Sequence, residues 1–307
     1  MKTYINLVIL LTSLAFNSCS EKEIQKSEEQ LLRISYTSKT DNSHRDYFVY
    51  LPKGYDQNSD KKWPVLMFLH GDGERGNGKD ELDYTLIHGP LYEAWVQKRD
   101  LPFVIIVPQL HMFGRDTLGI SYIDNRSLDE IPKRMSKGVP NRANTFASKQ
   151  PMHGAVPADA IPGDIYTDAG WDNLEEDLMA MLDQTLKNYN TDVKRVYLTG
   201  LSYGGFGTWY IASNHPERFA AINPIVGWGD PRLMQPISTH KIPVWAFAGG
   251  RDNTVQVQYF FAGINKLEEL GNDKVKFTIH EDMGHDTWKR VYAGEDIYNW
   301  FLENSKK

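Results

Sequence analysis

Short runs of apolar residues recur along the chain and alternate with stretches of helical spacing. Residues 64–69 are continuously apolar, which is typical of a strand covered on both faces of a sheet. Residues 275–281 instead alternate apolar with polar positions, as an outer strand would. Strands that alternate with helices predict a mostly parallel sheet with helices on both faces. The first two of eight expected strands should pair antiparallel, and the strands are expected at residues 31–37, 45–51, 64–69, 103–107, 194–198, 219–226, 243–248 and 275–281. Helices are expected after Asp172 and at residues 91–98, 207–215, 255–270 and 288–302.

The long stretch between the fourth and fifth strands, residues 110–170, breaks this pattern. It has no sustained periodicity and is rich in Gly, Pro, Asn and Asp. Loops of this length are usually functional lids or disordered. Aromatic residues and methionines are scattered through it, and disordered segments are poor in such residues. We therefore expect a cap insertion packed over a functional site, with disorder as the alternative.

Length and charge limit the class of protein. The chain has 307 residues, enough for one large α/β domain, and 41% hydrophobic and 24% charged residues are ordinary globular values. The net charge is -6 and no basic run is present. Nucleic acid is therefore not expected as a partner, because phosphate binding needs a clustered positive face.

The N-terminus reads as an export signal rather than as part of the fold. Lys2 precedes an apolar segment at residues 4–16, which at about 20 Å is shorter than a membrane core of about 30 Å. The single cysteine, Cys19, follows it in a setting similar to the lipobox of bacterial lipoproteins. We expect residues 1–19 to be a lipoprotein-type signal peptide with Cys19 acylated, and plain secretory cleavage stays open. The product would be periplasmic or on the cell surface, held to the outer membrane only through its lipid, with residues 20–30 as a flexible tether to a domain at 31–307.

A G-x-S-x-G sequence, Gly200 to Gly204, follows the fifth expected strand and precedes a helix. In this context it predicts a sharp strand-to-helix turn that lifts the hydroxyl of Ser202 above the sheet. Glycine on either side lets the strand and the helix approach closely. An ordinary glycine-rich loop with a capping serine is the alternative.

Two further residues follow strands at the edge where ligands bind in such sheets. Asp252 comes after the seventh strand and His285 after the eighth, which gives the serine, acid, base order of α/β-hydrolases. The imidazole would take the serine proton, and the carboxylate would fix the imidazole tautomer. Asp252 could instead cap the helix that follows, and Asp282 and His280 are the rival acid and base.

Glycines also follow the third strand, where Gly71, Gly73 and Gly76 match the G-x-G-x-x-G dinucleotide fingerprint. That fingerprint must open a helix at once, and a loop sequence follows here instead. We interpret the stretch as the loop that donates a backbone N–H to an oxyanion. The two predicted donors are the main-chain N–H groups of Asp72 and Tyr203.

Three stretches together, residues 69–76, 200–209 and 284–288, resemble one group of α/β-hydrolases. These are secreted esterases related to carbohydrate esterase family one, which contains feruloyl and acetylxylan esterases, and to the bacterial "predicted peptidase" group. The resemblance implies an α/β-hydrolase fold and a serine carboxylic-ester hydrolase without metal or organic cofactor, acting on acyl or feruloyl esters of polysaccharide. The insertion at 110–170 is longer than the family leads one to expect. Candidate substrate contacts near the mouth are Gln109, Trp228 and Trp288.

The residues leave two other functions open. A serine peptidase could use the same three side chains, since the imidazole can protonate an amine leaving group. A catalytically silent glycan-binding lipoprotein would need neither the three side chains nor the two donor loops.

Overall fold

The computed structural model describes residues 27–139, 148–152, 156–158, 160–163 and 170–307. The expected signal peptide, Cys19 and the first part of the tether lie outside these residues. Among the described residues, no helix is long and apolar enough to cross a membrane.

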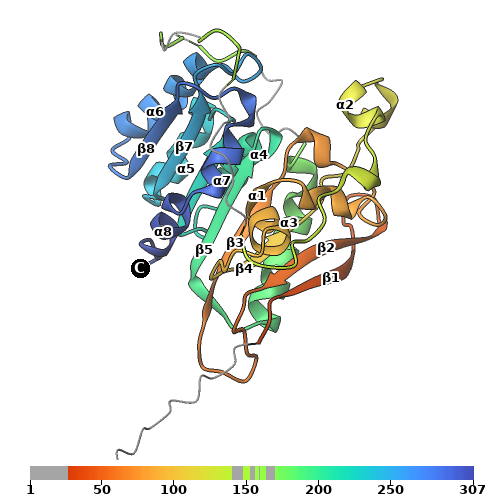
Figure 1. Ribbon diagram of the computed structural model, residues 1–307. Helices are drawn as coiled ribbons and strands as arrows, with labels where there is room; N and C mark the ends of the chain where they lie inside the picture. Colours follow the sequence, from red (N-terminus) through yellow and green to blue (C-terminus); the bar gives the residue numbers. More distant parts are fainter. Residues whose placement is uncertain (1–26, 140–147, 153–155, 159, 164–169) are drawn as a thin grey trace, which may run out of the picture.

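One mixed sheet of eight strands forms the centre of the domain, in the order β1-β2-β4-β3-β5-β6-β7-β8 (Figure 1). The antiparallel hairpin of β1 (Gln30–Thr37) and β2 (His44–Leu51) forms one edge, and β2 pairs antiparallel with β4 (Val104–Val107). The other five strands, together with β4, run parallel to one another. The predicted sheet is thereby confirmed. These five strands are β3 (Trp63–Leu69), β5 (Thr191–Leu201), β6 (Ala221–Ile225), β7 (Val244–Gly249) and β8 (Val275–His280).

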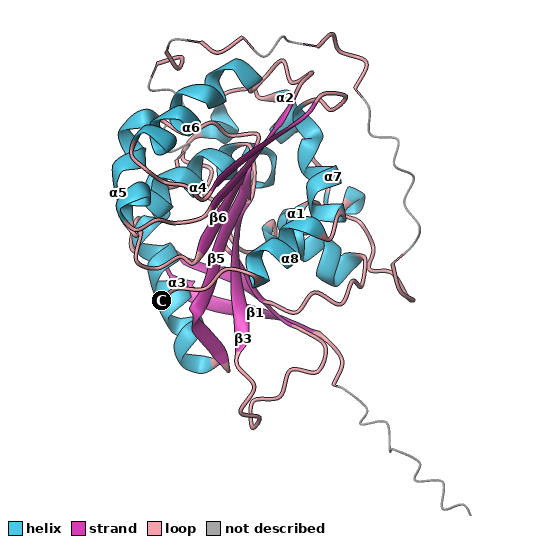
Figure 2. Cartoon of the chain, turned by 90° about the vertical axis from the view of Figure 1, so that its left-hand side faces the viewer, coloured by secondary structure: helices cyan, strands magenta, loops and turns pink. Residues whose placement is uncertain are grey.

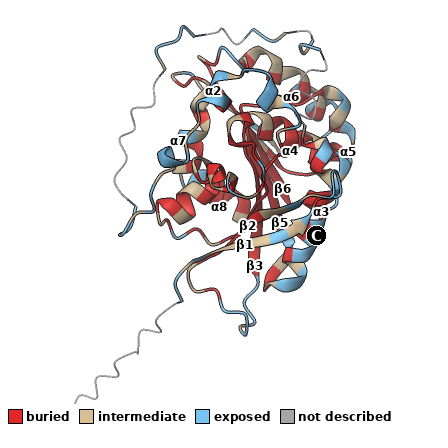
Figure 3. Cartoon of the chain, turned by 90° about the vertical axis from the view of Figure 1, so that its right-hand side faces the viewer, coloured by how far each residue is buried: buried red, intermediate tan, exposed pale blue. Residues whose placement is uncertain are grey.

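Helices cover both faces of this sheet, and each face has its own apolar core (Figure 2). The first core includes side chains from α3 (Glu175–Asn188), α4 (Tyr203–Asn214), α5 (Met234–Thr239) and α6 (Phe260–Glu269). The second includes side chains from α1 (Gly89–Leu91), α7 (Trp288–Ala293) and α8 (Asp296–Leu302). The central strands are almost wholly buried, which accounts for their continuous apolar sequences (Figure 3).

Four helices differ from the expectation. The helix expected at 255–270 is α6, which begins at Phe260 after a 3-10 turn at Val257–Tyr259. The helix expected at 207–215 begins four residues earlier, at Tyr203, directly after Ser202. The helix expected at 91–98 is one α-helical turn that continues as a π-helical turn, Tyr92–Val96. The last helix, expected at 288–302, is divided into α7 and α8 because Gly294 has an extended backbone.

Candidate active site

The turn between β5 and α4 holds Ser202 in an unusual backbone conformation. Its φ is 52° and its ψ is -116°, a region that residues with a side chain rarely adopt. A Cβ at Gly200 would overlap the carbonyl of Gly204, and a Cβ at Gly204 would overlap the carbonyl oxygen of Leu69. Only glycine therefore allows β3, β5 and α4 to meet this closely. The strand, turn and helix context that the G-x-S-x-G motif requires is present.

Three side chains from separate loops form one hydrogen-bonded line at this turn. His285 Nε2 lies 3.0 Å from Ser202 Oγ, and His285 Nδ1 lies 2.8 Å from Asp252 Oδ2. Asp252 is fully buried. With Nδ1–H donating to the carboxylate, the lone pair of Nε2 faces the serine hydroxyl, an arrangement that can accept the serine proton.

The carboxylate of Asp252 also stabilises the turn that follows it, but it does not cap a helix, because the next helical turn begins at Val257 with Gln256 as its N-cap. Its second oxygen, Oδ1, accepts hydrogen bonds from the backbone N–H groups of Thr254 at 2.8 Å and Val255 at 2.9 Å. The alternative of a helix-capping aspartate is therefore wrong, and the two oxygens divide between this turn and His285. The two backbone donors hold the carboxylate in the orientation that faces His285.

The rival acid and base are engaged elsewhere. Asp282 forms a two-pronged ion pair with Arg290, at 2.6 Å for both contacts, and this hydrogen bonding lowers the pKa of Asp282 to about 2. His280 lies stacked on Phe247 with ring centroids 5.8 Å apart, and burial lowers its pKa.

The loop after β3 passes beside the nucleophile. A Cβ on Gly71 would lie 3.6 Å from the Cβ of Ser202, and Asp72 opens a 3-10 turn, Asp72–Glu74, rather than the α-helix of a dinucleotide site. Asp72 and Tyr203, the two predicted oxyanion donors, line the same cavity as Ser202 and His285.

The buried imidazole of His70 orients the backbone of this loop. Nε2 accepts from the N–H of Leu110 at 2.9 Å, so Nδ1–H donates to the carbonyl of Gly71 at 2.6 Å. Burial lowers the pKa of His70 to about 3, and the ring stays neutral. In a trans peptide the carbonyl and the following N–H point in opposite directions. His70 therefore turns the N–H of Asp72 away from itself.

The cavity at this site has a volume of about 690 Å³. Several residues that line the cavity were not predicted. Residues 84–88 carry no motif, and the loop that contains Glu74 was predicted to contribute only a backbone N–H. Burial raises the pKa of the Glu74 carboxyl to about 7. Among the described residues no group of three or more His, Cys, Asp or Glu is placed to hold a metal. The walls that sequence analysis missed include Glu74, Tyr84, Ile87, His88, Tyr122, Arg126 and Thr254.

Of the three candidate substrate contacts, one lines the cavity. Trp288 packs edge-on against His285, with ring centroids 5.2 Å apart. Trp228 is buried against Phe206 and Tyr259 and is absent from the cavity wall. The prediction for Trp228 is therefore corrected to a packing role.

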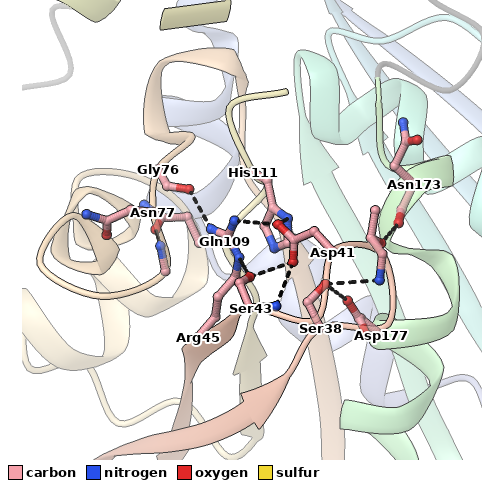
Figure 4. A network of polar contacts seen from close by, with 12 residues as sticks. Ser38, Asp41, Ser43, Arg45, Gly76, Asn77, Gln109, His111, Asn173 and Asp177 are labelled. Atoms are coloured by element: carbon pink, nitrogen blue, oxygen red, sulfur yellow. Dashed lines mark hydrogen bonds and ion pairs between the residues drawn. The ribbon is translucent and has the colours of Figure 1, made fainter. Parts of the chain in front are cut away.

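Gln109 is also corrected to a structural role. Its buried amide accepts from the N–H of Gly78 at 2.9 Å and donates to the carbonyls of Glu74 at 2.9 Å and Glu81 at 2.7 Å. Arg45 reaches the same loop through the carbonyl of Gly76, at 3.4 Å (Figure 4). A position just after a strand indicates the correct sheet edge, but it does not indicate which way the side chain points.

Known proteins resemble both the sequence and the fold. The model of the prolyl oligopeptidase family matches residues 163–245, which include β5, the turn at Ser202 and α4. A solved thermostable esterase is 26% identical with a TM-score of 0.61, over 90% of this chain and 63% of that one. This chain has the α/β-hydrolase fold.

Curated relatives of this α/β-hydrolase agree with the resemblance that its motifs indicate. A bifunctional acetylxylan esterase/xylanase of Neocallimastix patriciarum is 33% identical over 81 residues, 25% of this chain and 11% of the relative. Feruloyl esterase B of Neurospora crassa is 34% identical over 87 residues, 27% of this chain and 24% of the relative. The resemblance is confirmed, although the match spans no more than about a quarter of either relative.

Proposed function

We propose that this chain is a serine carboxylic-ester hydrolase that works through an acyl-enzyme on Ser202. The observation that carries the proposal is the hydrogen-bonded line from Ser202 through His285 to Asp252, located at a strained turn and open to a cavity. A hydroxyl becomes an effective nucleophile when a positioned base accepts its proton, and this line provides that base.

In the proposed reaction, Ser202 Oγ attacks the ester carbonyl while its proton passes to Nε2 of His285. Asp252 stabilises the resulting imidazolium through Nδ1–H. The N–H groups of Asp72 and Tyr203 would donate to the oxyanion of the tetrahedral intermediate. His285 then gives its proton to the departing alcohol, which leaves the acyl group on Ser202. Water, deprotonated by the same imidazole, releases the acid and restores the hydroxyl.

Acyl or feruloyl esters of polysaccharide are the substrate class that we propose. The support comes from relatives named as acetylxylan and feruloyl esterases and from a cavity with aromatic walls at Tyr84, Tyr122 and Trp288. A polysaccharide substrate would also suit an exported protein.

A serine peptidase is the second candidate, and the observation that favours it is the match to the prolyl oligopeptidase family model. The same three side chains serve both chemistries. A silent glycan-binding protein has less support, because binding alone requires neither the strained serine nor the aligned imidazole.

One set of assays separates these candidates. Wild type and Ser202→Ala are compared on p-nitrophenyl acetate, methyl ferulate, acetylated xylan and a panel of peptides. We expect ester turnover in the wild type and its loss in Ser202→Ala. Ester turnover that survives the substitution would refute the mechanism, and peptide turnover far above ester turnover would favour the peptidase.

We also propose that Cys19 is acylated and that the protein is anchored to the outer membrane. The support is the position of this single cysteine directly after the apolar N-terminal segment. Metabolic labelling with palmitate should mark the wild type and leave Cys19→Ala unlabelled. Equal labelling of both proteins would rule out this site.

A further inference from the structure

Two side chains from the insertion reach into the oxyanion loop. The hydroxyl of Tyr122 in α2 (Ser121–Asp124) donates to Asp72 Oδ2 at 2.6 Å. The guanidinium of Arg115, in the 3-10 turn Arg115–Thr117, forms an ion pair with the same oxygen. Although α2 lies at the periphery of the domain (Figure 1), its tyrosine is thus tied to the residue whose N–H is proposed to face the substrate.

Arg75, which is buried in the domain, forms an ion pair with the same carboxylate. Its Nε donates to Asp72 Oδ1 at 2.7 Å, and its Nη1 donates to the carbonyl of His111 at 2.8 Å. Arg75 contacts one carboxylate oxygen of Asp72, and Arg115 and Tyr122 contact the other. These contacts fix the orientation of the Asp72 side chain. The main chain of Asp72 is restrained together with it.

The same two guanidinium groups contact the second proposed donor residue. The central carbon of Arg115 lies 5.2 Å from the centre of the Tyr203 ring, and that of Arg75 lies 5.4 Å from it. These are distances at which a cation is attracted to an aromatic face. Asp72 and Tyr203 are therefore held by one cluster of two cations and one carboxylate, which carries a net positive charge beside the site of the oxyanion.

We propose that Arg115 and Tyr122 are positioning residues that hold the oxyanion loop, residues 71–76, in place for catalysis. We call this contact between the insertion and Asp72 the brace. This inference rests on the proposed esterase function. An oxyanion donor must lie about 2.7–3.1 Å from the developing charge, and a displacement of about 1 Å can cost about 100-fold in rate. The Asp72 carboxylate is buried, but after the loss of Arg115 it still accepts hydrogen bonds from Arg75 and Tyr122, so this loop should loosen while the domain stays folded.

A matched pair of substitutions tests the brace. Arg115→Met removes the insertion's charge from Asp72, while Arg218→Met removes an arginine of the same 23% side-chain exposure that pairs with Asp183 away from the cavity. Arg115→Lys keeps the charge, and Tyr122→Phe removes only the hydroxyl. We expect kcat on p-nitrophenyl acetate to fall about 10- to 100-fold in Arg115→Met and less in Arg115→Lys and Tyr122→Phe, with KM within about twofold. Arg218→Met should match the wild type.

Amide hydrogen exchange over residues 71–76 gives a reading that does not depend on turnover. We expect faster exchange in Arg115→Met and only a slightly lower melting temperature, because Arg75 still pairs with the buried carboxylate. A raised KM at unchanged kcat would overturn the inference in favour of direct substrate contact, and unchanged exchange in that loop would also overturn it. If the wild type hydrolyses no ester but Arg115→Met still accelerates exchange, the brace stands and the esterase proposal fails. If the wild type is active and Arg115→Met retains full kcat, the esterase stands and the brace fails.

Discussion

The two oxygens of the Asp252 carboxylate have separate partners, so substitutions can separate its proposed catalytic role from its structural one. Oδ2 faces His285 at 2.8 Å, and Oδ1 accepts from the N–H groups of Thr254 and Val255. In Asp252→Asn, these two donors should select the amide oxygen, which leaves the NH₂ group facing the imidazole. Nδ1 must then accept rather than donate, so that Nε2 is protonated and cannot take the serine proton.

The two substitutions should therefore have similar effects on catalysis and different effects on stability. A wrong tautomer costs about 10⁴-fold in kcat, or about 5.5 kcal/mol in the barrier, and we expect this loss in Asp252→Asn and at least as large a loss in Asp252→Ala. Asp252→Ala also leaves two backbone donors without their acceptor. At about 1 kcal/mol for each hydrogen bond, its free energy of unfolding should be about 2 kcal/mol below that of Asp252→Asn.

The assays are steady-state hydrolysis of p-nitrophenyl acetate and urea unfolding of the wild type and both variants. Asp282→Asn serves as the control, since that residue pairs with Arg290 and does not contact His285 through its carboxylate. An Asp252→Asn protein within about tenfold of wild-type kcat would refute the tautomer argument. Equal stability of the two Asp252 variants would refute the stabilising role of these two turn contacts.

Three more predictions follow from the geometry of the loops around Ser202. Gly204→Ala should destabilise the fold by several kcal/mol, about 3 or more, because its Cβ would overlap the backbone of Leu69, whereas Gly163→Ala has open space and should melt like the wild type. Glu74→Gln should gain stability relative to wild type as the pH rises. The pKa of Glu74 in the folded protein is raised from 4.5 to about 7, so the stability that its protonated carboxyl contributes is full below pH 4.5 and is lost as the pH rises through 7. The unfolding free energy of Glu74→Gln relative to wild type should thus increase between about pH 5 and about pH 8, and a flat difference would contradict the assignment. Gln109→Ala should lower the melting temperature, because it removes the three hydrogen bonds of a buried amide, and should leave KM for p-nitrophenyl acetate unchanged. A raised KM would return this residue to the substrate site.

The sequence alone determined the sheet and the identity of the three aligned side chains. Local patterns carry this information, because a strand buried on both faces must be apolar and a sharp turn must have glycine beside Ser202. The order Ser202, Asp252, His285 is also readable, since the carboxyl ends of parallel strands share one edge of the sheet.

Only the tertiary structure decided where side chains point and which distant segments meet. Gln109 and Trp228 follow strands just as Asp252 does, yet packing turned both away from the cavity. The contacts of Arg115 and Tyr122 with Asp72 join residues more than forty positions apart, and Arg115 and Tyr122 lie in the insertion that has no periodicity. Such contacts depend on how the completed chain packs, and no local repeat of polar and apolar residues encodes them.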